Sequence, residues 1–285
     1  MDESRNGRVA GSRAGRTLRG LSFNRMLPNI ITLTALCSGL TAIRFALGGD
    51  FRAAAIAVIV AGILDALDGR VARRLNTTSR FGAELDSLSD FCAFGVAPAL
   101  VLYLWTMGSA GTFGWLATLL FPICSAMRLA RFNVGLQNDE KPPMWAGAFF
   151  TGVPAPAGAL IVLAPLMLGL SPELAWTWTR DPLLVGVFLV VVGGLMVSRI
   201  PAYSFKKGRI PDHLVLPVFL GVALLVGLLA TAPWVTLPAL AMIYVATLPL
   251  SWRARRRLEE AERSKAAPAE VVELRSVTGD GGERR

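Results

Sequence analysis

Four aspartates in an otherwise apolar stretch are the first candidates for chemistry. Asp65 and Asp68 lie three residues apart, and Asp86 and Asp90 lie four residues apart. On helices, either spacing places both carboxylates of a pair on one face. If the two helices pack side by side, the four carboxylates converge in one pocket.

Such a cluster needs compensation for its charge. Each carboxylate near the centre of a membrane helix costs about 2.5–3.5 kcal/mol on insertion scales, and like charges repel one another. Divalent cations offset both costs, and oxygen-only ligands favour hard ions such as Mg²⁺, Mn²⁺ or Ca²⁺ over zinc. The sequence therefore predicts a metal site at these carboxylates.

The residues around the carboxylates suit a phosphate-bearing substrate. Arg73 can donate charge-assisted hydrogen bonds to phosphate oxygens. Gly69 and Gly82 lack side chains, so that a nucleotide could approach the backbone closely. Metal ions would neutralise a pyrophosphate and stabilise a nucleotide leaving group. One carboxylate could then deprotonate an acceptor hydroxyl.

The elements that must position these side chains are predicted to be membrane helices. The chain of 285 residues is 53% hydrophobic and only 17% charged, with a mean hydropathy of +0.52. Its apolar blocks reach the length of about 20 residues that spans a bilayer. We expect an all-α, polytopic membrane helix bundle of about eight transmembrane helices, with Pro154 and Pro156 breaking or bending the fifth. The expected spans are residues 28–48, 51–69, 86–106, 113–132, 147–169, 182–199, 213–231 and 234–251.

Charge divides the chain into three parts. A basic segment (residues 1–27) precedes a transmembrane catalytic domain (28–252), and a basic tail (253–285) follows that we expect to be disordered. The basic residues gather at both ends and in alternate loops, which predicts that both termini and the aspartates face the cytoplasm at the cell inner membrane. The net charge of +9 therefore indicates orientation and attraction to anionic lipid, not nucleic-acid binding.

The aspartates belong to a longer pattern. Asp-x2-Asp-Gly-x2-Ala-Arg-x8-Gly-x3-Asp-x3-Asp, which begins at Asp65, resembles the signature of the CDP-alcohol phosphatidyltransferase family at every specified position. The resemblance implies that Asp65, Asp68, Asp86 and Asp90 bind Mg²⁺ or Mn²⁺, as two ions, and that Asp90 also acts as the base. It also implies a homodimer. The residues that it implies for binding of CDP-diacylglycerol are Asn29, Thr32, Asp65, Gly69, Ala72, Arg73 and Gly82.

The acceptor alcohol is not specified by the signature itself. Its surroundings resemble the phosphatidylserine-forming branch of that family, in residues 27–32, 79–90, 94–99, 128–133 and 152–158. This resemblance makes L-serine the expected acceptor. The carboxylate of serine needs a cation, which Arg128 or Arg131 at the end of the fourth expected span could supply, while Asn133 could bind the ammonium group or a phosphate. Alternatively, these arginines mark the membrane boundary or bind lipid phosphate.

Two further readings stay open. The acceptor could be glycerol 3-phosphate, inositol phosphate or choline, although a phosphorylated acceptor should need a denser basic site. From another class, the chain could be a divalent-cation transporter. A transport route would need ionisable residues at depth in the later spans, which contain almost none.

Overall fold

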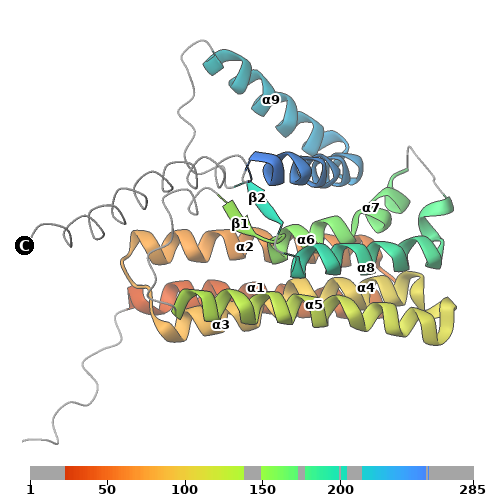
Figure 1. The fold of residues 1–285 in the computed structure, drawn as a ribbon, viewed down its shortest axis with the longest axis horizontal. Coiled ribbons are helices and arrows are strands. Elements are labelled where there is room, and N and C mark those ends of the chain that lie inside the picture. The colour runs from red at the N-terminus through yellow and green to blue at the C-terminus, as the bar shows by residue number, and fades with distance from the viewer. Residues whose placement is uncertain are drawn as a thin grey trace, which may run out of the picture.

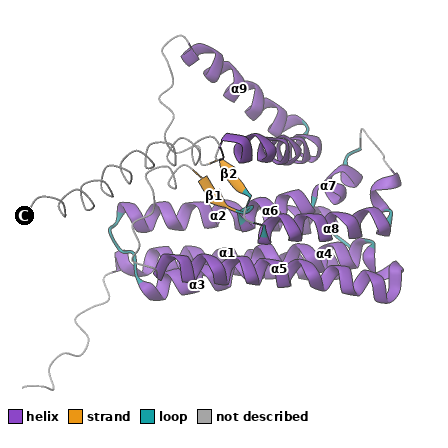
Figure 2. Ribbon diagram, in the orientation of Figure 1, coloured by secondary structure: helices purple, strands orange, loops and turns teal. Residues whose placement is uncertain are grey.

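The structure, a computed structural model, is helical almost throughout (Figures 1 and 2). It describes residues 23–137, 149–172, 177–198, 200–203, 214–254 and 256. Most of the basic amino-terminal segment and most of the tail predicted to be disordered lie outside these residues. Two short strands, β1 (Phe149–Thr151) and β2 (Pro201–Tyr203), pair antiparallel. Apart from this ribbon, the described residues fit the all-α membrane class that the sequence predicts.

Helices α1 (Phe23–Leu47) and α2 (Phe51–Arg74) pack against each other along their lengths. A tight turn joins them, with Gly49 at a φ of 79° that favours glycine. Asp50 then caps α2, because its carboxylate accepts a hydrogen bond of 2.9 Å from the backbone N–H of Ala53. The cap fixes the first residue of α2 and therefore the positions of Asp65 and Asp68 along the helix.

The next element is one long helical stretch with a change of winding in the middle. Helix α3 (Arg80–Asp90) begins at Ser79, whose hydroxyl accepts from the backbone N–H of Gly82 at 3.0 Å. The π-helical turn η1 (Phe91–Val96) follows directly, and α4 (Ala97–Trp105) continues. Turns of this kind are frequent at functional sites, and this one starts at the residue after Asp90.

Most of the remaining elements complete the bundle, whereas α9 extends away from it and has no buried residue (Figure 1). Helix α5 packs against α8, and one face of the helix Pro233–Ala254, which follows α9, packs against the hydrophobic core. In order, these elements are η2 (Met107–Ala110), α5 (Gly111–Gln137), α6 (Ala155–Val162), α7 (Ala164–Leu170), η4 (Thr177–Arg180), α8 (Pro182–Val197), α9 (Val215–Thr231) and an unlabelled helix over Pro233–Ala254.

Within the described ranges, four helices are long and apolar enough to cross a membrane: Met26–Leu47, Arg80–Trp105, Met107–Gly135 and Pro233–Ala254. The expected number of about eight is not confirmed. Helix α2 is 24 residues long, but it carries Arg52, Asp65 and Asp68, and these charges lower its membrane character. Helices α8 and α9 are apolar but shorter.

The expected fifth span, residues 147–169, is not one helix. It begins with strand β1, and its helical part is divided into α6 and α7 at Leu163. Pro154 is the residue before α6, and Pro165 stands in the first turn of α7. Proline has no backbone N–H to donate and is best accommodated in the first turn of a helix, which fits two short helices that each begin beside a proline.

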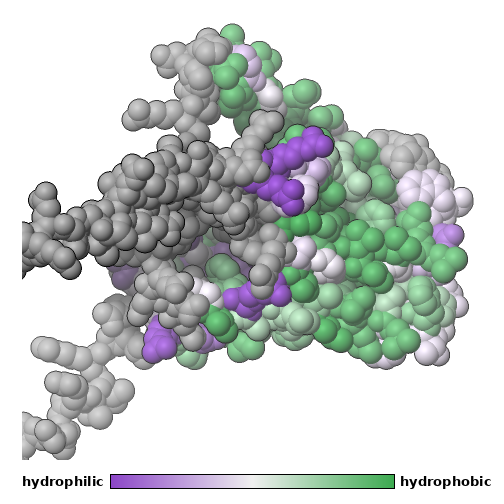
Figure 3. Space-filling view, in the orientation of Figure 1, coloured by the Kyte–Doolittle hydropathy of each residue, from purple (hydrophilic) through white to green (hydrophobic). Residues whose placement is uncertain are grey.

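Small side chains let the helices of the site approach closely. Alanines of α1 and α2 are fully buried, among them Ala42, Ala54 and Ala61. A Cβ atom placed on Gly39 would lie 2.6 Å from the Cα atom of Ala93. Such close backbone approach is typical of helix pairs in membranes. By contrast, the outer surface is rich in exposed large apolar side chains, as Figure 3 shows over most of its coloured area.

We predict that Gly39→Ala destabilises the protein. The added methyl group meets backbone atoms of η1, which cannot move away as the end of a flexible side chain could, and overpacking of this kind costs about 1–3 kcal/mol. The melting temperature in detergent should fall by several degrees. Gly221→Ala in α9 is the matched control, because nothing lies within 4 Å of a Cβ atom there. Equal melting temperatures for the two variants would contradict the close packing of α1 on η1.

Candidate active site

Three of the four aspartates meet where α2 and α3 lie beside α1. Carboxylate oxygens of Asp65, Asp68 and Asp86 all lie within 4.8 Å of one another. The carboxyl groups of Asp65 and Asp90 hydrogen-bond to each other. The structure therefore brings all four predicted residues into one cluster, with Asp90 joined to the group of three through Asp65.

Asp68 is the most enclosed of the four, at 5% exposed. The hydroxyl of Thr32 in α1 donates to its carboxylate at 2.7 Å, and the backbone N–H of Gly69 donates as well. The hydroxyl of Thr32 also lies 3.0 Å from the carbonyl oxygen of Pro28. These contacts fix the Asp68 carboxylate against α1 and point it toward the other acids.

The chemistry of this cluster fits a divalent cation. Three carboxylates so close together repel one another, and the two carboxyls of Asp65 and Asp90 can share a hydrogen bond only if a proton lies between them. A hard cation would balance the charge of the group, and its oxygen donors match what Mg²⁺ and Mn²⁺ prefer. Asp65, Asp68 and Asp86 are the residues that could hold it.

A cavity of about 180 Å³ opens beside the acids. Of the residues expected to bind the donor, all but Asp65 line it: Asn29, Thr32, Gly69, Ala72, Arg73 and Gly82. A Cβ atom on Gly82 would lie 3.1 Å from the Ser79 hydroxyl and 3.2 Å from Asn29 Oδ1. A larger side chain at this position would therefore press into the cavity wall, which explains the glycine.

The connection between α2 and α3 adds residues to this cavity that the sequence analysis missed. Thr77, Thr78 and Ser79 all line it. The hydroxyl of Thr77 is buried without a hydrogen-bond partner among the described residues. The sequence did contain a signal for these residues, a run of three hydroxyl side chains between the two acidic pairs. A buried hydroxyl usually has a hydrogen-bond partner, so the unpaired Thr77 hydroxyl is available to a ligand.

A second, larger cavity of about 430 Å³ lies on another face of α2. Its walls are almost entirely apolar and come from α2, α6, α7 and the helix Pro233–Ala254, with Leu160, Met167 and Leu237 among them. Arg70 is its charged member. The site thus combines a polar cavity at the acids with an apolar one nearby on the same helix.

The three residues expected to bind serine have different surroundings. Arg128 in α5 interacts electrostatically with Asp90. Arg131 is exposed and donates to the carbonyl oxygen of Val197 at 2.7 Å, at the carboxyl end of α8. The amide of Asn133 donates to the Ser87 hydroxyl at 3.1 Å. Of the three, Arg128 is the one that the described contacts bring to the aspartates.

Comparison with known proteins matches this site to one family. The model of the CDP-alcohol phosphatidyltransferase family matches residues 25–198, and a second model, CDP-alcohol phosphatidyltransferase 2, matches residues 213–249. A protein of Mycobacterium leprae (strain TN) called CDP-diacylglycerol–serine O-phosphatidyltransferase is 40% identical over 227 residues, 80% of this chain and 74% of the relative.

Other relatives carry the same name. The one from Mycobacterium tuberculosis (strain ATCC 25618 / H37Rv) is 37% identical over 242 residues, 85% of this chain and 83% of the relative. The one from Bacillus subtilis (strain 168) is 32% identical over 182 residues, 64% of this chain and 92% of the relative. The region that the family model matches, residues 25–198, includes both acidic pairs of the site.

We predict that Thr32→Val weakens metal binding about tenfold, the lower end of what the loss of a ligand's hydrogen-bond partner costs. Valine keeps the shape of threonine but removes the donor to Asp68. Titration of the purified protein with Mn²⁺, followed by electron paramagnetic resonance of the free ion, measures the affinity. Thr34→Val is the matched control, because the Thr34 hydroxyl bonds only within its own helix, to the carbonyl of Ile30 at 2.8 Å. An unchanged affinity in Thr32→Val would contradict the role of this contact.

Proposed function

The chain belongs to the CDP-alcohol phosphatidyltransferase family, and we propose that it transfers the phosphatidyl group of CDP-diacylglycerol to the hydroxyl of L-serine, yielding phosphatidylserine and CMP. The observation that carries the proposal is the cluster of four aspartates beside a polar cavity, with Arg128 against Asp90. The names of the relatives support serine as the acceptor.

Binding of the donor would use both cavities. The polar cavity would take the CDP group, with Arg73 donating to phosphate oxygens and Gly69 and Gly82 leaving room along the backbone. The apolar cavity on α2 is suited to an acyl chain that enters sideways from the inner leaflet. Asp65, Asp68 and Asp86, with Asp90 beside them, would hold two Mg²⁺ or Mn²⁺ ions, which when bound neutralise the pyrophosphate and stabilise the CMP leaving group.

Asp90 would carry the proton transfer. Its carboxylate takes the proton from the serine hydroxyl, and the serine oxygen forms a bond to the phosphorus that bears diacylglycerol. The bond from that phosphorus to the CMP oxygen breaks, CMP departs with the electron pair, and Asp90 later releases its proton to water. Transfer is direct, without a covalent enzyme intermediate. Arg128 would offset the negative charge of the serine carboxylate.

The membrane arrangement is also a proposal. Eight membrane segments would place both termini and the site at the cytoplasmic face of the inner membrane, where CDP-diacylglycerol and serine are both accessible. The distribution of basic residues supports this orientation. Family resemblance supports a homodimer.

The first prediction from this proposal is that purified protein releases CMP from CDP-diacylglycerol in mixed micelles when serine and Mn²⁺ or Mg²⁺ are present, and that EDTA stops the reaction. Phosphatidylserine should appear by mass spectrometry. Parallel reactions with glycerol 3-phosphate, inositol phosphate and choline test the other acceptors. CMP release with one of these instead of serine would replace the acceptor, whereas cation flux into liposomes without any CMP would favour a transporter.

The second prediction is that Asp90→Asn lowers turnover by at least about 10²-fold, which is the lower range for loss of a general base. CDP-diacylglycerol should still raise the melting temperature of the variant, because the donor-binding residues are unchanged. Asp50→Asn is the matched control: its side chain caps α2 at the other end, and asparagine caps as well as aspartate. Full activity of Asp90→Asn would refute the assignment of the base.

A further inference from the structure

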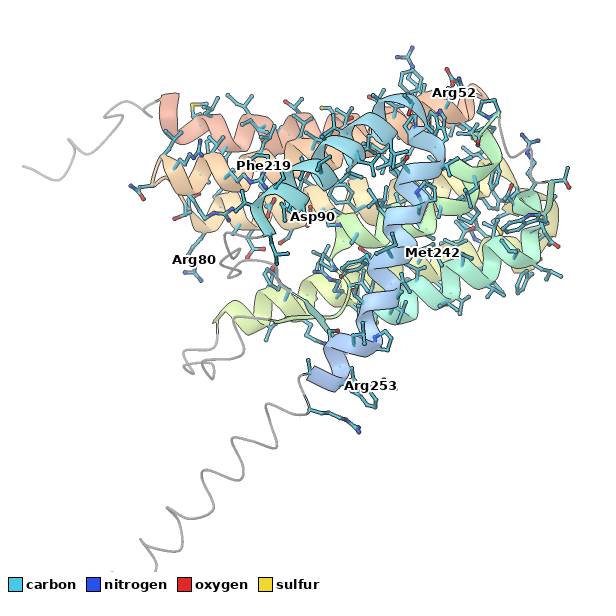
Figure 4. All side chains as sticks on the ribbon, turned by 90° about the horizontal axis from the view of Figure 1, so that it is seen from above. Arg52, Arg80, Asp90, Phe219, Met242 and Arg253 are labelled. Carbon is cyan, nitrogen blue, oxygen red and sulfur yellow. The ribbon has the colours of Figure 1, made fainter. Side chains whose placement is uncertain are left out.

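The helix Pro233–Ala254 packs a tyrosine, Tyr244, against the bundle. Its packed face includes Leu237, Ala241 and Leu248, and Tyr244 and Val245 lie on the same stripe against the core. The neighbouring Met242 and Ile243 are instead 48% and 61% exposed. Figure 4 shows this helix, labelled at Met242 and Arg253, where it crosses the bundle that contains Asp90.

The end of this tyrosine side chain lies at the candidate active site. Tyr244 and Arg128 interact electrostatically, and Arg128 also interacts with Asp90. The phenol oxygen of Tyr244 and the Nε atom of Arg128 are both buried, and neither has a hydrogen-bond partner among the described residues. Buried polar atoms of this kind are rare, because each lost hydrogen bond destabilises the protein.

Two buried donors without partners, one of them on a guanidinium, suit a specific kind of ligand. The Tyr244 O–H and the Arg128 Nε–H can each donate to one oxygen of the same group. A carboxylate has two oxygens and a single negative charge, which one guanidinium balances. A phosphate dianion carries a second charge that Arg128 alone does not balance. Arg131, the other described arginine near the end of α5, donates instead to the end of α8.

We infer that Tyr244 and Arg128 together bind the carboxylate of the amino-acid acceptor, so that the helix Pro233–Ala254 completes the acceptor site. This inference rests on the proposed function and assigns Tyr244 as a residue that determines acceptor specificity. In serine, the carboxylate and the hydroxyl oxygen are separated by two carbon atoms. A carboxylate bound at Arg128 therefore leaves the hydroxyl within reach of the neighbouring Asp90.

The test compares Tyr244→Phe with wild type for two acceptors, L-serine and L-serine methyl ester. The ester keeps the hydroxyl and the ammonium group but has no carboxylate charge. Tyr244→Phe should raise the KM for serine about tenfold or more, as expected for loss of a hydrogen bond to a charged group. The KM for the ester and for CDP-diacylglycerol should stay the same in variant and wild type. Tyr103→Phe is the control, because Tyr103 packs against Trp115 on α5, away from the aspartates, and should leave every KM unchanged.

The outcomes separate this inference from the function on which it rests. An unchanged serine KM in Tyr244→Phe, with wild type active on serine, would overturn the inference alone. An equal rise for serine and its ester would also overturn it, because that pattern indicates a general packing effect. Wild type that releases no CMP with serine would remove both proposals. If Tyr244→Phe lowers the melting temperature, Arg128→Lys provides the second measurement: it keeps the charge but loses Nε–H, and must show the same serine-specific rise.

Discussion

Repulsion among four carboxylates at one end of an apolar bundle is the constraint on which the rest of the site depends. Each ionised carboxylate near lipid raises the free energy of the folded protein, and repulsion between neighbouring carboxylates raises it further. The surroundings offset this cost in two ways: the Thr32 hydroxyl and the Gly69 N–H donate hydrogen bonds to Asp68, and the positive charge of Arg128 interacts with Asp90. A cation bound among the carboxylates would offset the repulsion that remains, and could in turn bind a pyrophosphate.

The close approach of α1 to the acidic helices follows from this constraint. Thr32 can reach Asp68 only because the α1 and α2 backbones are close, and small residues such as Ala42, Ala54 and Ala61 make this distance possible. Gly39 has the same effect against Ala93, three residues after Asp90. In the cavity, Gly82 leaves the space between Ser79 and Asn29 free. The same small residues therefore serve two purposes: they allow close helix packing, and they keep the carboxylates and the cavity in position.

The donor side of the site could be predicted from the sequence because it is local. Asp65, Asp68, Asp86 and Asp90 come from two consecutive helices, and helical spacing alone puts each pair on one face. Pro154 and Pro156 were expected to break or bend the fifth span, and its helical part does begin beside them, at Ala155. The second division, at Leu163 before Pro165, was not expected, because apolar composition alone does not reveal it. Arg131 had the spacing of a ligand residue, but its bond to Val197 depends on how α5 and α8 pack, and no local pattern encodes that.

The proposed acceptor side could be predicted only in part, because it is assembled from distant parts of the chain: the sequence analysis named Arg128 as a candidate but not Tyr244. Arg128 and Tyr244 belong to helices that meet only in the folded bundle. Tyr244 has no motif around it, and in the sequence it looks like an ordinary interfacial aromatic residue of the last membrane helix.

The division of the proposed site into a donor side and an acceptor side has a functional consequence. The residues proposed to hold the metals lie in one motif, and those proposed to hold the nucleotide lie in that motif or in α1, at Asn29 and Thr32. The residues proposed for the acceptor lie on α5 and the last helix. On this proposal, a change of acceptor would need substitutions on α5 or the last helix and would leave the aspartates untouched.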